Sequence, residues 1–234
     1  MTLANHSNWN LPPPPGFQGL REDLPLTVYQ QLLPHWRQAG ATYFVTFRLA
    51  DSLPQSKLHE LQRFKAEWER QHPPPKTATQ LDDVAREMFR RIEGWLDQGM
   101  GCCALRDPKQ SQRVIEAMHD RDGTAYELGC YVVMANHVHA VVRPLVPSEN
   151  DIEGVLKSWK GRSAYEINRL RGESGTFWQR ETFDRIIRDD EHLWRVIQYI
   201  GRNPKNAGLE TATCPLWIRP SWVKCGWRFV DNGS

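Results

Sequence analysis

Two histidines one residue apart lie inside a segment with the composition of a buried β-strand. His137 and His139 flank the apolar Val138 in YVVMANHVHAVVRPL, residues 131–145. Side chains alternate between the two faces of a strand, so residues two apart point the same way. The two imidazoles are therefore expected to converge, and such a pair can supply two neighbouring ligands to one metal ion. Two hydrogen-bonded strand histidines without a metal are the alternative.

A second pattern lies in EHLWRVIQYIGRNP, residues 191–204, whose apolar residues recur with helical spacing. Tyr199 and Asn203 are four residues apart and therefore neighbours on the helix surface. A phenol beside an amide oxygen pairs a potential nucleophile with a potential metal ligand. Alternatively, Tyr199 packs in the core and Asn203 ends the helix. Pro204 is expected to stop this helix, because proline cannot continue normal helical hydrogen bonding.

Apolar alternation predicts strands at 41–50, 125–134 and 137–145. Helical spacing and its stop signals predict helices at 56–71, 79–98, 108–120, 150–171 and 189–203. Because the last two strands follow each other directly, we expect an antiparallel sheet with helices on one side, an α+β sandwich. No internal repeat and no second folded domain are visible.

Composition indicates an ordinary globular protein, with 25% charged residues and a formal net charge of +2 in 234 residues. Five cysteines without a disulfide pattern are expected to be reduced thiols. The N-terminus shows no basic stretch followed by an apolar run, and no run of about 18 apolar residues suggests a membrane span. We therefore expect a cytoplasmic protein without a membrane partner.

Composition also shifts along the chain. Residues 1–34 are proline-rich, with LPPPPG at 11–16, and we expect an irregular, mobile arm. Residues 35–209 are expected to form the catalytic domain. The tail, residues 210–234, alternates Trp217, Trp222 and Trp227 with basic residues. This alternation suits base stacking on a single strand, but the same tryptophans could instead dock the tail onto the domain.

The two chemical patterns occur together with a longer series of motifs. In chain order, these are LPHWRQAGATYFVTFRLADSLP, LGCYVVMANHVHAVVRPL, LKSWKGRSAYEIN, FWQRETFDRIIRD and YIGRNPKNAGL, spanning residues 33–209. In this order and spacing the chain resembles the REP-associated tyrosine transposases, a branch of the single-tyrosine HUH nucleases. The resemblance implies a ferredoxin-like sandwich, with the histidines on a central strand and a tyrosine facing them from a C-terminal helix.

Carried over residue by residue, the resemblance makes His137, His139 and Asn203 the metal ligands and Tyr199 the nucleophile. It implies Mg²⁺ or Mn²⁺ as the cofactor, and cleavage of single-stranded DNA through a 5′-phosphotyrosine intermediate. The implied DNA is a hairpin formed by a repetitive extragenic palindrome (REP). Tyr165 also follows the histidines on a predicted helix, but no amide residue lies four positions after it, so Tyr199 is preferred.

Binding to the DNA backbone requires clustered cations. The basic residues expected to bind DNA follow the histidines and are Lys157, Lys160, Arg162, Arg180, Arg185 and Arg188. A solvated basic helix face is the alternative. Because all proposed site residues come from one chain, a monomer or a homodimer is compatible with the sequence, and a DNA-bound protein would be associated with the nucleoid.

Two other functions remain open from the sequence. One is a catalytically silent, domesticated binder of structured single-stranded DNA, which would need neither the histidines nor Tyr199. The other is a small-molecule metalloenzyme on a similar sandwich, which would not need the basic residues and would not depend on Tyr199.

Overall fold

The computed structural model describes residues 11–30, 33–145 and 151–230. Its centre is a five-stranded sheet in which every neighbouring pair is antiparallel, in the order β6-β3-β5-β4-β7. The strands are β3 (Tyr43–Arg48), β4 (Tyr126–Val133), β5 (His137–Pro144), β6 (Phe183–Ile186) and β7 (Leu216–Ile218). Helices connect β3 to β4 and β5 to β6, so the order β6-β3-β5-β4 is that of a ferredoxin-like sandwich. The predicted α+β class is confirmed.

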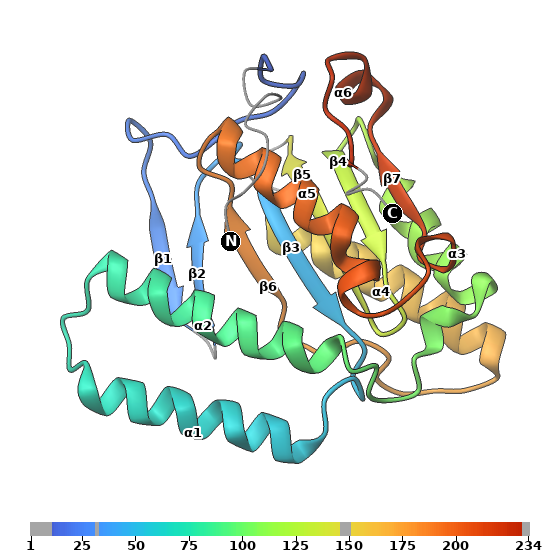
Figure 1. The fold of residues 1–234 in the computed structure, drawn as a ribbon, viewed down its shortest axis with the longest axis horizontal. Coiled ribbons are helices and arrows are strands. Elements are labelled where there is room, and N and C mark those ends of the chain that lie inside the picture. Colours follow the sequence, from blue (N-terminus) through green and yellow to red (C-terminus); the bar gives the residue numbers. More distant parts are fainter. Residues whose placement is uncertain (1–10, 31–32, 146–150, 231–234) are drawn as a thin grey trace.

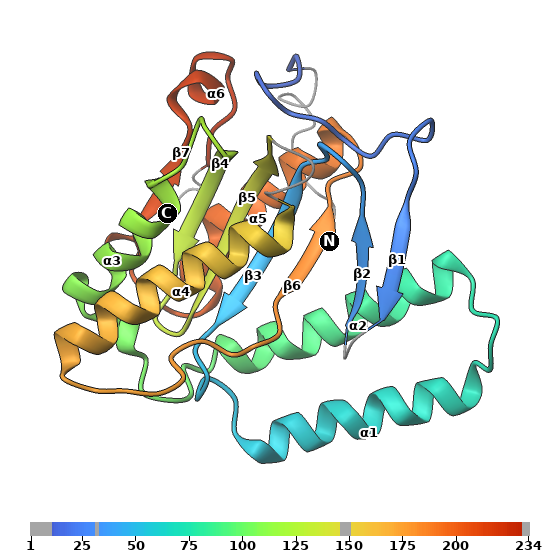
Figure 2. The ribbon, with the colours of Figure 1, turned by 180° about the vertical axis from the view of Figure 1, so that it is seen from behind.

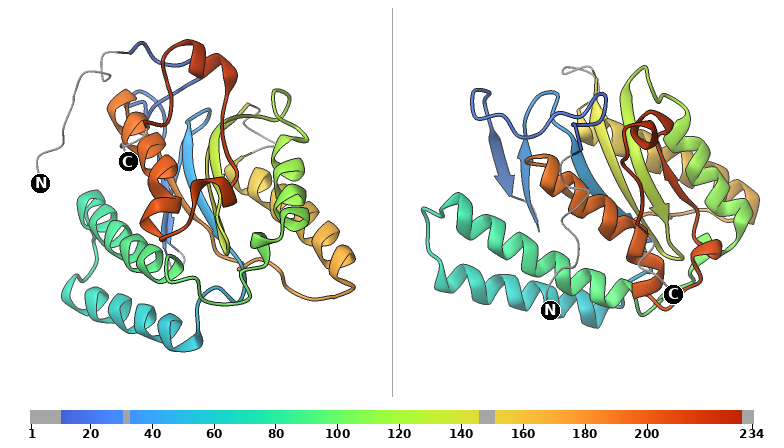
Figure 3. Two further views of the ribbon diagram at one scale, coloured as in Figure 1. Left: turned by 45° about the vertical axis from the view of Figure 1, so that its right-hand side comes forward. Right: turned by 45° about the horizontal axis from the view of Figure 1, so that its top comes forward.

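Helices cover both faces of this sheet (Figure 1). On one face lie α3 (Pro108–His119) and α4 (Ile152–Arg171), which are nearest the viewer in Figure 2. On the other face lies α5 (Asp190–Asn206). The hairpin of α1 (Gln55–Gln71) and α2 (Ala78–Leu96) flanks the sheet, with α2 between α1 and the sheet in Figure 3. The expectation of helices on one side was wrong, because α5 buries the second face.

The alternation along β3 explains the two layers. Tyr43, Val45 and Phe47 point into the core under α3 and α4, whereas Phe44 points into the core under α5. Val138, between the two histidines, belongs to the α3–α4 side. The histidines therefore face α5, as strand alternation requires.

Short elements account for most differences from the predicted pattern. A two-stranded ribbon, β1 (Thr27–Gln30) paired with β2 (Pro34–Arg37), lies where an irregular arm was expected. Strands β6 and β7 were also missed, as were the turns η2 (Ala104–Arg106) and η3 (Thr211–Thr213) and the short helix α6 (Pro220–Lys224). Strands of three or four residues carry too little alternation to be recognised without their partners.

The two ends of the described chain pack together. The indole N–H groups of Trp222 and Trp227 donate to the carbonyls of Pro15 and Pro12, at 2.9 and 2.8 Å. Both indoles are buried, so docking, not base stacking, is the role of these two rings. Residues 11–15 are accordingly packed against the tail. The boundaries at 34 and 209 remain predictions.

The tail also supports α5 from outside. Gln198 donates to the carbonyl of Arg228 and accepts from the amide of Val230, both at 2.9 Å. Gly201 leaves room for Phe229, because a Cβ at this position would lie 2.8 Å from the Phe229 ring. The helix that carries Tyr199 is thus held between the sheet and the tail.

Helix α5 continues to Asn206, so the expected stop at Pro204 was wrong. Proline removes one hydrogen bond, and within the last turn few intrahelical bonds remain to be broken. No helix within the described ranges combines the length and apolar character needed to cross a membrane.

Candidate active site

The histidine pair begins strand β5 in the middle of the sheet. His137 and His139 lie opposite Arg48 and Thr46 of β3 in the register. Both imidazoles are fully buried, and their Nε2 atoms are 3.1 Å apart. The convergence predicted from the spacing is confirmed by this distance.

Asn136 fixes the orientation of the first imidazole. Its amide Nδ2 donates to the carbonyls of Leu96 and Met100, both at 3.2 Å, so its Oδ1 is the atom that faces His137. That oxygen accepts from His137 Nδ1 at 2.8 Å. Nδ1 therefore carries the proton, and Nε2 presents a lone pair toward His139.

His139 is held by its own Nδ1, which lies 2.7 Å from the Thr46 hydroxyl, a group that can donate or accept. The two Nε2 atoms thus meet without an intervening protein group. At 3.1 Å they can share a proton or bind one cation, and that arrangement suits a metal ligand pair.

Glu93 on α2 completes the cluster, and no sequence motif pointed to it. Its Oε2 lies 3.0 Å from His139 Nε2. One potential ligand atom from each of Glu93, His137 and His139 lies within 4.8 Å of the others. The available signal was a carboxylate among the buried positions of an amphipathic helix, between Ile92 and Trp95. Nothing local to α2 indicates which distant residues it meets.

Tyr199 faces this cluster from α5. Its hydroxyl donates to Glu93 Oε2, and its ring packs edge-on against Phe44. Burial, together with the neighbouring charge of Glu93, holds the pKa of the Tyr199 phenol above its usual range. By contrast, Tyr165 on α4 is 66% exposed and lies on the helix that covers the opposite face. The geometry places Tyr199, not Tyr165, beside the histidines.

Three buried oxygens at this site lack a hydrogen-bond partner among the described residues: Glu93 Oε1, Asp97 Oδ1 and Asn203 Oδ1. Asn203 lies near enough to act on both neighbours: it raises the pKa of His137 and lowers that of Tyr199. Buried acceptors without donors are costly. Oxygen and imidazole ligands around one point fit a divalent cation, which would compensate these acceptors.

The electrostatics agree with ligand roles. Burial and the nearby His139 lower the pKa of His137 to about 3, so its imidazole is neutral at physiological pH. Burial alone would raise the pKa of Glu93, but His139, with His137 and Tyr199, outweighs burial, and the pKa lies below its usual value. Burial and the charge of Glu93 raise the pKa of Asp97 to about 6. A neutral imidazole and a carboxylate are the forms that bind metals.

The six cations expected to bind DNA divide into three groups. Lys157, Lys160 and Arg180 line one cavity beside α4. Arg162 forms an ion pair with Asp120.

Arg185 and Arg188 both bind Asp82 on α2, at 2.9 and 2.7 Å. They line a different, smaller cavity at the β6 edge. The structure therefore gathers only half of the predicted set in one place.

Comparisons with known proteins give one match to describe. No family model and no curated protein matches the chain. Among solved structures, that of a REP-associated tyrosine transposase bound to a REP hairpin matches with a TM-score of 0.45 and 17% identity, over 84% of this chain and 87% of that chain. This is the family to which the sequence motifs point.

Proposed function

We propose that this protein is a metal-dependent single-strand DNA endonuclease and strand transferase of the HUH tyrosine type. The observation that carries the proposal is the contact of one phenol, Tyr199, with a buried His137–His139–Glu93 cluster. A protein that only binds DNA needs no such cluster. A small-molecule metalloenzyme would not need a tyrosine held against it.

The cation, Mg²⁺ or Mn²⁺, would be bound by His137 Nε2, His139 Nε2 and the unpartnered oxygens of Glu93 and Asn203. When bound, it would offset the charge that develops on the scissile phosphate oxygens. Asn136 and Thr46 hold the imidazoles so that both Nε2 atoms face the site. Glu93 is thereby added to His137, His139 and Asn203, the three ligands that the resemblance implies.

Tyr199 would act as the nucleophile on the phosphorus of one phosphodiester. Its Oη–P bond forms as the bond from phosphorus to the 3′-oxygen breaks, leaving a 5′-phosphotyrosine and a 3′-hydroxyl. The phenolic proton already lies on a hydrogen bond to Glu93, which can accept it, and the leaving oxygen takes a proton from water. Because no water is consumed at phosphorus, the phosphotyrosine can be attacked by another 3′-hydroxyl and the strand rejoined.

The proposed substrate is single-stranded DNA folded as a REP-like hairpin, which follows from the sequence motifs. All the proposed ligands and the nucleophile come from one chain, so a monomer contains a complete site.

The test is covalent capture. Labelled hairpin DNA from repeats that flank the gene is incubated with purified protein and Mn²⁺ or Mg²⁺, then analysed on a denaturing protein gel. Wild type and Tyr165→Phe should give a covalent band, and Tyr199→Phe should give none. A band that survives Tyr199→Phe would contradict the assigned nucleophile. No band with wild type, with DNA still retained on a native gel, would leave a DNA-binding protein without the proposed chemistry.

A further inference from the structure

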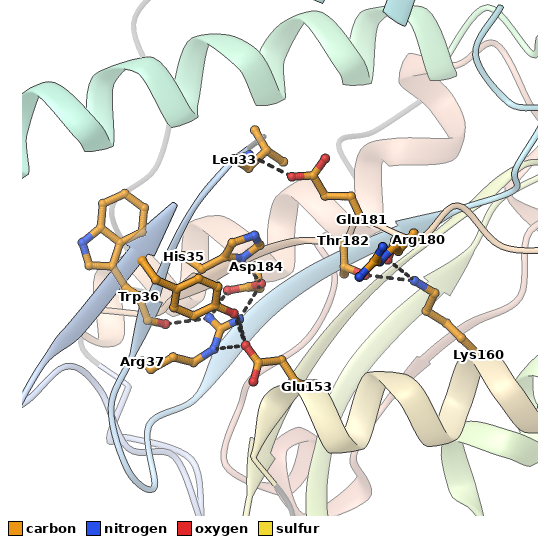
Figure 4. Close-up of polar contacts among 11 residues, drawn as sticks. Leu33, His35, Trp36, Arg37, Glu153, Lys160, Arg180, Glu181, Thr182 and Asp184 are labelled. Carbon is orange, nitrogen blue, oxygen red and sulfur yellow. Dashed lines mark hydrogen bonds and ion pairs between the residues drawn. The ribbon is translucent and has the colours of Figure 1, made fainter. Parts of the chain in front are cut away.

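A second polar region lies outside the cluster of His137, His139 and Glu93. It is a cavity of about 720 Å³ enclosed by strand β2, helix α4 and residues 175–184, and Figure 4 shows its polar contacts. This volume lies within the range of small-ligand sites. The proposed reaction uses none of its residues.

Three cations at this cavity have no carboxylate partner among the described residues: Lys157, Lys160 and Arg180. The half-buried Lys160 ammonium donates only to neutral oxygens, the Arg180 carbonyl at 2.8 Å and the Thr182 hydroxyl at 3.3 Å. Lys157 and Arg180 are exposed. A partly desolvated ammonium bound only to neutral groups favours an anion.

The carboxylates nearby are already engaged. Asp184 binds His35 Nδ1 at 2.6 Å and Arg37 at 2.5 Å, and Glu153 binds Arg37 at 2.9 Å (Figure 4). Glu181 accepts from the amide of Leu33. Asp184 and Glu153 are thus paired with His35 and Arg37, whereas Glu181 acts on Lys160 only through its charge and forms no ion pair with it.

His35 supplies a different kind of group. Its Nδ1 faces a carboxylate and is therefore a donor, so in the neutral imidazole Nε2 carries the lone pair. That Nε2 is buried without a partner in the described structure. The ring of Tyr29 stacks on the imidazole with centroids 5.1 Å apart. The cavity thus combines cations and an aromatic wall with a histidine whose Nε2 is buried and without a partner among the described residues.

The cavity is connected to the active site through shared residues. Glu181 and Thr182 line both this cavity and a smaller one, which is also lined by Thr46, Arg48 and Glu93. Arg48 lies opposite His137 in the sheet register. The shared residues place the cavity next to the smaller one that Glu93 lines.

We propose that this cavity binds one unpaired nucleotide of the DNA strand that Tyr199 cuts. Its phosphate contacts Lys157, Lys160 and Arg180, while its base lies beside Tyr29. This inference rests on the proposed function, because it assumes a single-stranded DNA substrate. It adds a site that selects and positions a base near the cleaved bond.

Binding is tested separately from chemistry. A labelled single-stranded oligonucleotide is titrated in EDTA against Tyr199→Phe protein, alone or with added substitutions. Lys157→Ala with Arg180→Ala should weaken binding about tenfold and reduce the slope of log K against log salt by about 1.4, because each phosphate-binding cation accounts for about 0.7 of that slope. Arg169→Ala, which removes an exposed cation from the same helix outside the cavity, should change neither quantity.

A photocross-link locates the base. Single strands carrying 5-iodouracil at one position at a time are irradiated with the protein, and the linked peptides are sequenced. One or two adjacent positions should link to residues 27–30, 33–37 or 175–184, and Tyr29→Ala should reduce that link.

The outcomes separate the two proposals. If the double variant binds like Arg169→Ala and no cross-link falls in these segments, the cavity site is wrong even if the covalent band forms. If wild type does not bind single strands, the proposed function itself fails. If strands bind and cross-link in the cavity but no covalent band forms, the nucleotide site stands and the nuclease proposal does not.

Discussion

The active site and the cavity lined by Lys157, Lys160 and Arg180 differ in the kind of polar group that lacks a partner. At the active site, the Nε2 atoms of His137 and His139 converge with buried oxygens such as Glu93 Oε1, which has no hydrogen-bond partner among the described residues. In the cavity, Lys157, Lys160 and Arg180 form no ion pair with a carboxylate among the residues described. One region is built to attract a cation and the other an anion.

The difference corresponds to the parts of a DNA strand. A phosphate that undergoes cleavage needs its charge offset by a cation, which protein acceptors hold in place. A phosphate that is only held in place can be bound by lysine and arginine directly. If the two regions have these roles, metal binding and strand binding should respond to different substitutions.

The largest expected effect is on metal binding. His139→Ala removes a ligand from the cluster and should lower Mn²⁺ affinity at least about 100-fold, measured by isothermal titration calorimetry. Single-strand affinity in EDTA should be unchanged. His35→Ala, which alters the buried histidine of the cavity, should keep full Mn²⁺ affinity. Equal decreases in the two variants would show that the histidines of the two regions have no separate roles.

A smaller effect is expected at Asn136, which orients His137 without joining the cluster. Asn136→Ala removes the acceptor for Nδ1–H and should weaken Mn²⁺ binding about tenfold. Asn136→Asp keeps an acceptor oxygen at that position and serves as the matched variant, with affinity close to wild type. If both variants lose affinity equally, His137 is oriented by the hydrogen bonds that the Asn136 amide donates to the Leu96 and Met100 carbonyls, and not by the bond from its own Nδ1.

The smallest effect concerns pH in the cavity. Burial and the charge of Arg48, against the opposing charge of Glu181, lower the pKa of Lys160 to about 8. The ammonium is therefore mostly charged at pH 7 and mostly neutral at pH 9. Single-strand affinity in EDTA should fall about threefold over this interval, the size of one exposed ionic contact. In Lys160→Arg, whose side chain stays charged at pH 9, the affinity should not fall. An equal decrease in this variant would show that deprotonation of Lys160 does not cause the pH dependence.

The parts of the site that depend on local periodicity could be predicted from the sequence. Strand alternation predicted the shared face of His137 and His139, and helical spacing predicted the neighbouring positions of Tyr199 and Asn203. Glu93 could not be placed, because it meets Tyr199 across 106 positions of the chain. Only packing of α2 beside the sheet joins them.

The basic residues illustrate the same limit. The sequence shows where cations occur but not whether a distant carboxylate neutralises them. Arg185 and Arg188 are bound by Asp82, more than 100 positions earlier, whereas Lys160 has no such partner within the described chain. The short strands of the fold were missed for a related reason, since β6 and β7 are defined by their neighbours in the sheet.

The hydrogen bonds between the two ends of the chain have a consequence for the timing of folding. The Trp222–Pro15 and Trp227–Pro12 bonds join residues 207 and 215 positions apart. Closing such long loops carries a high entropic cost, and contacts of this separation form late. The outer support of α5 should therefore be assembled after the sheet that carries the histidines. The two histidines would be in place first, and Tyr199 and Asn203, which α5 carries, would be firmly held last.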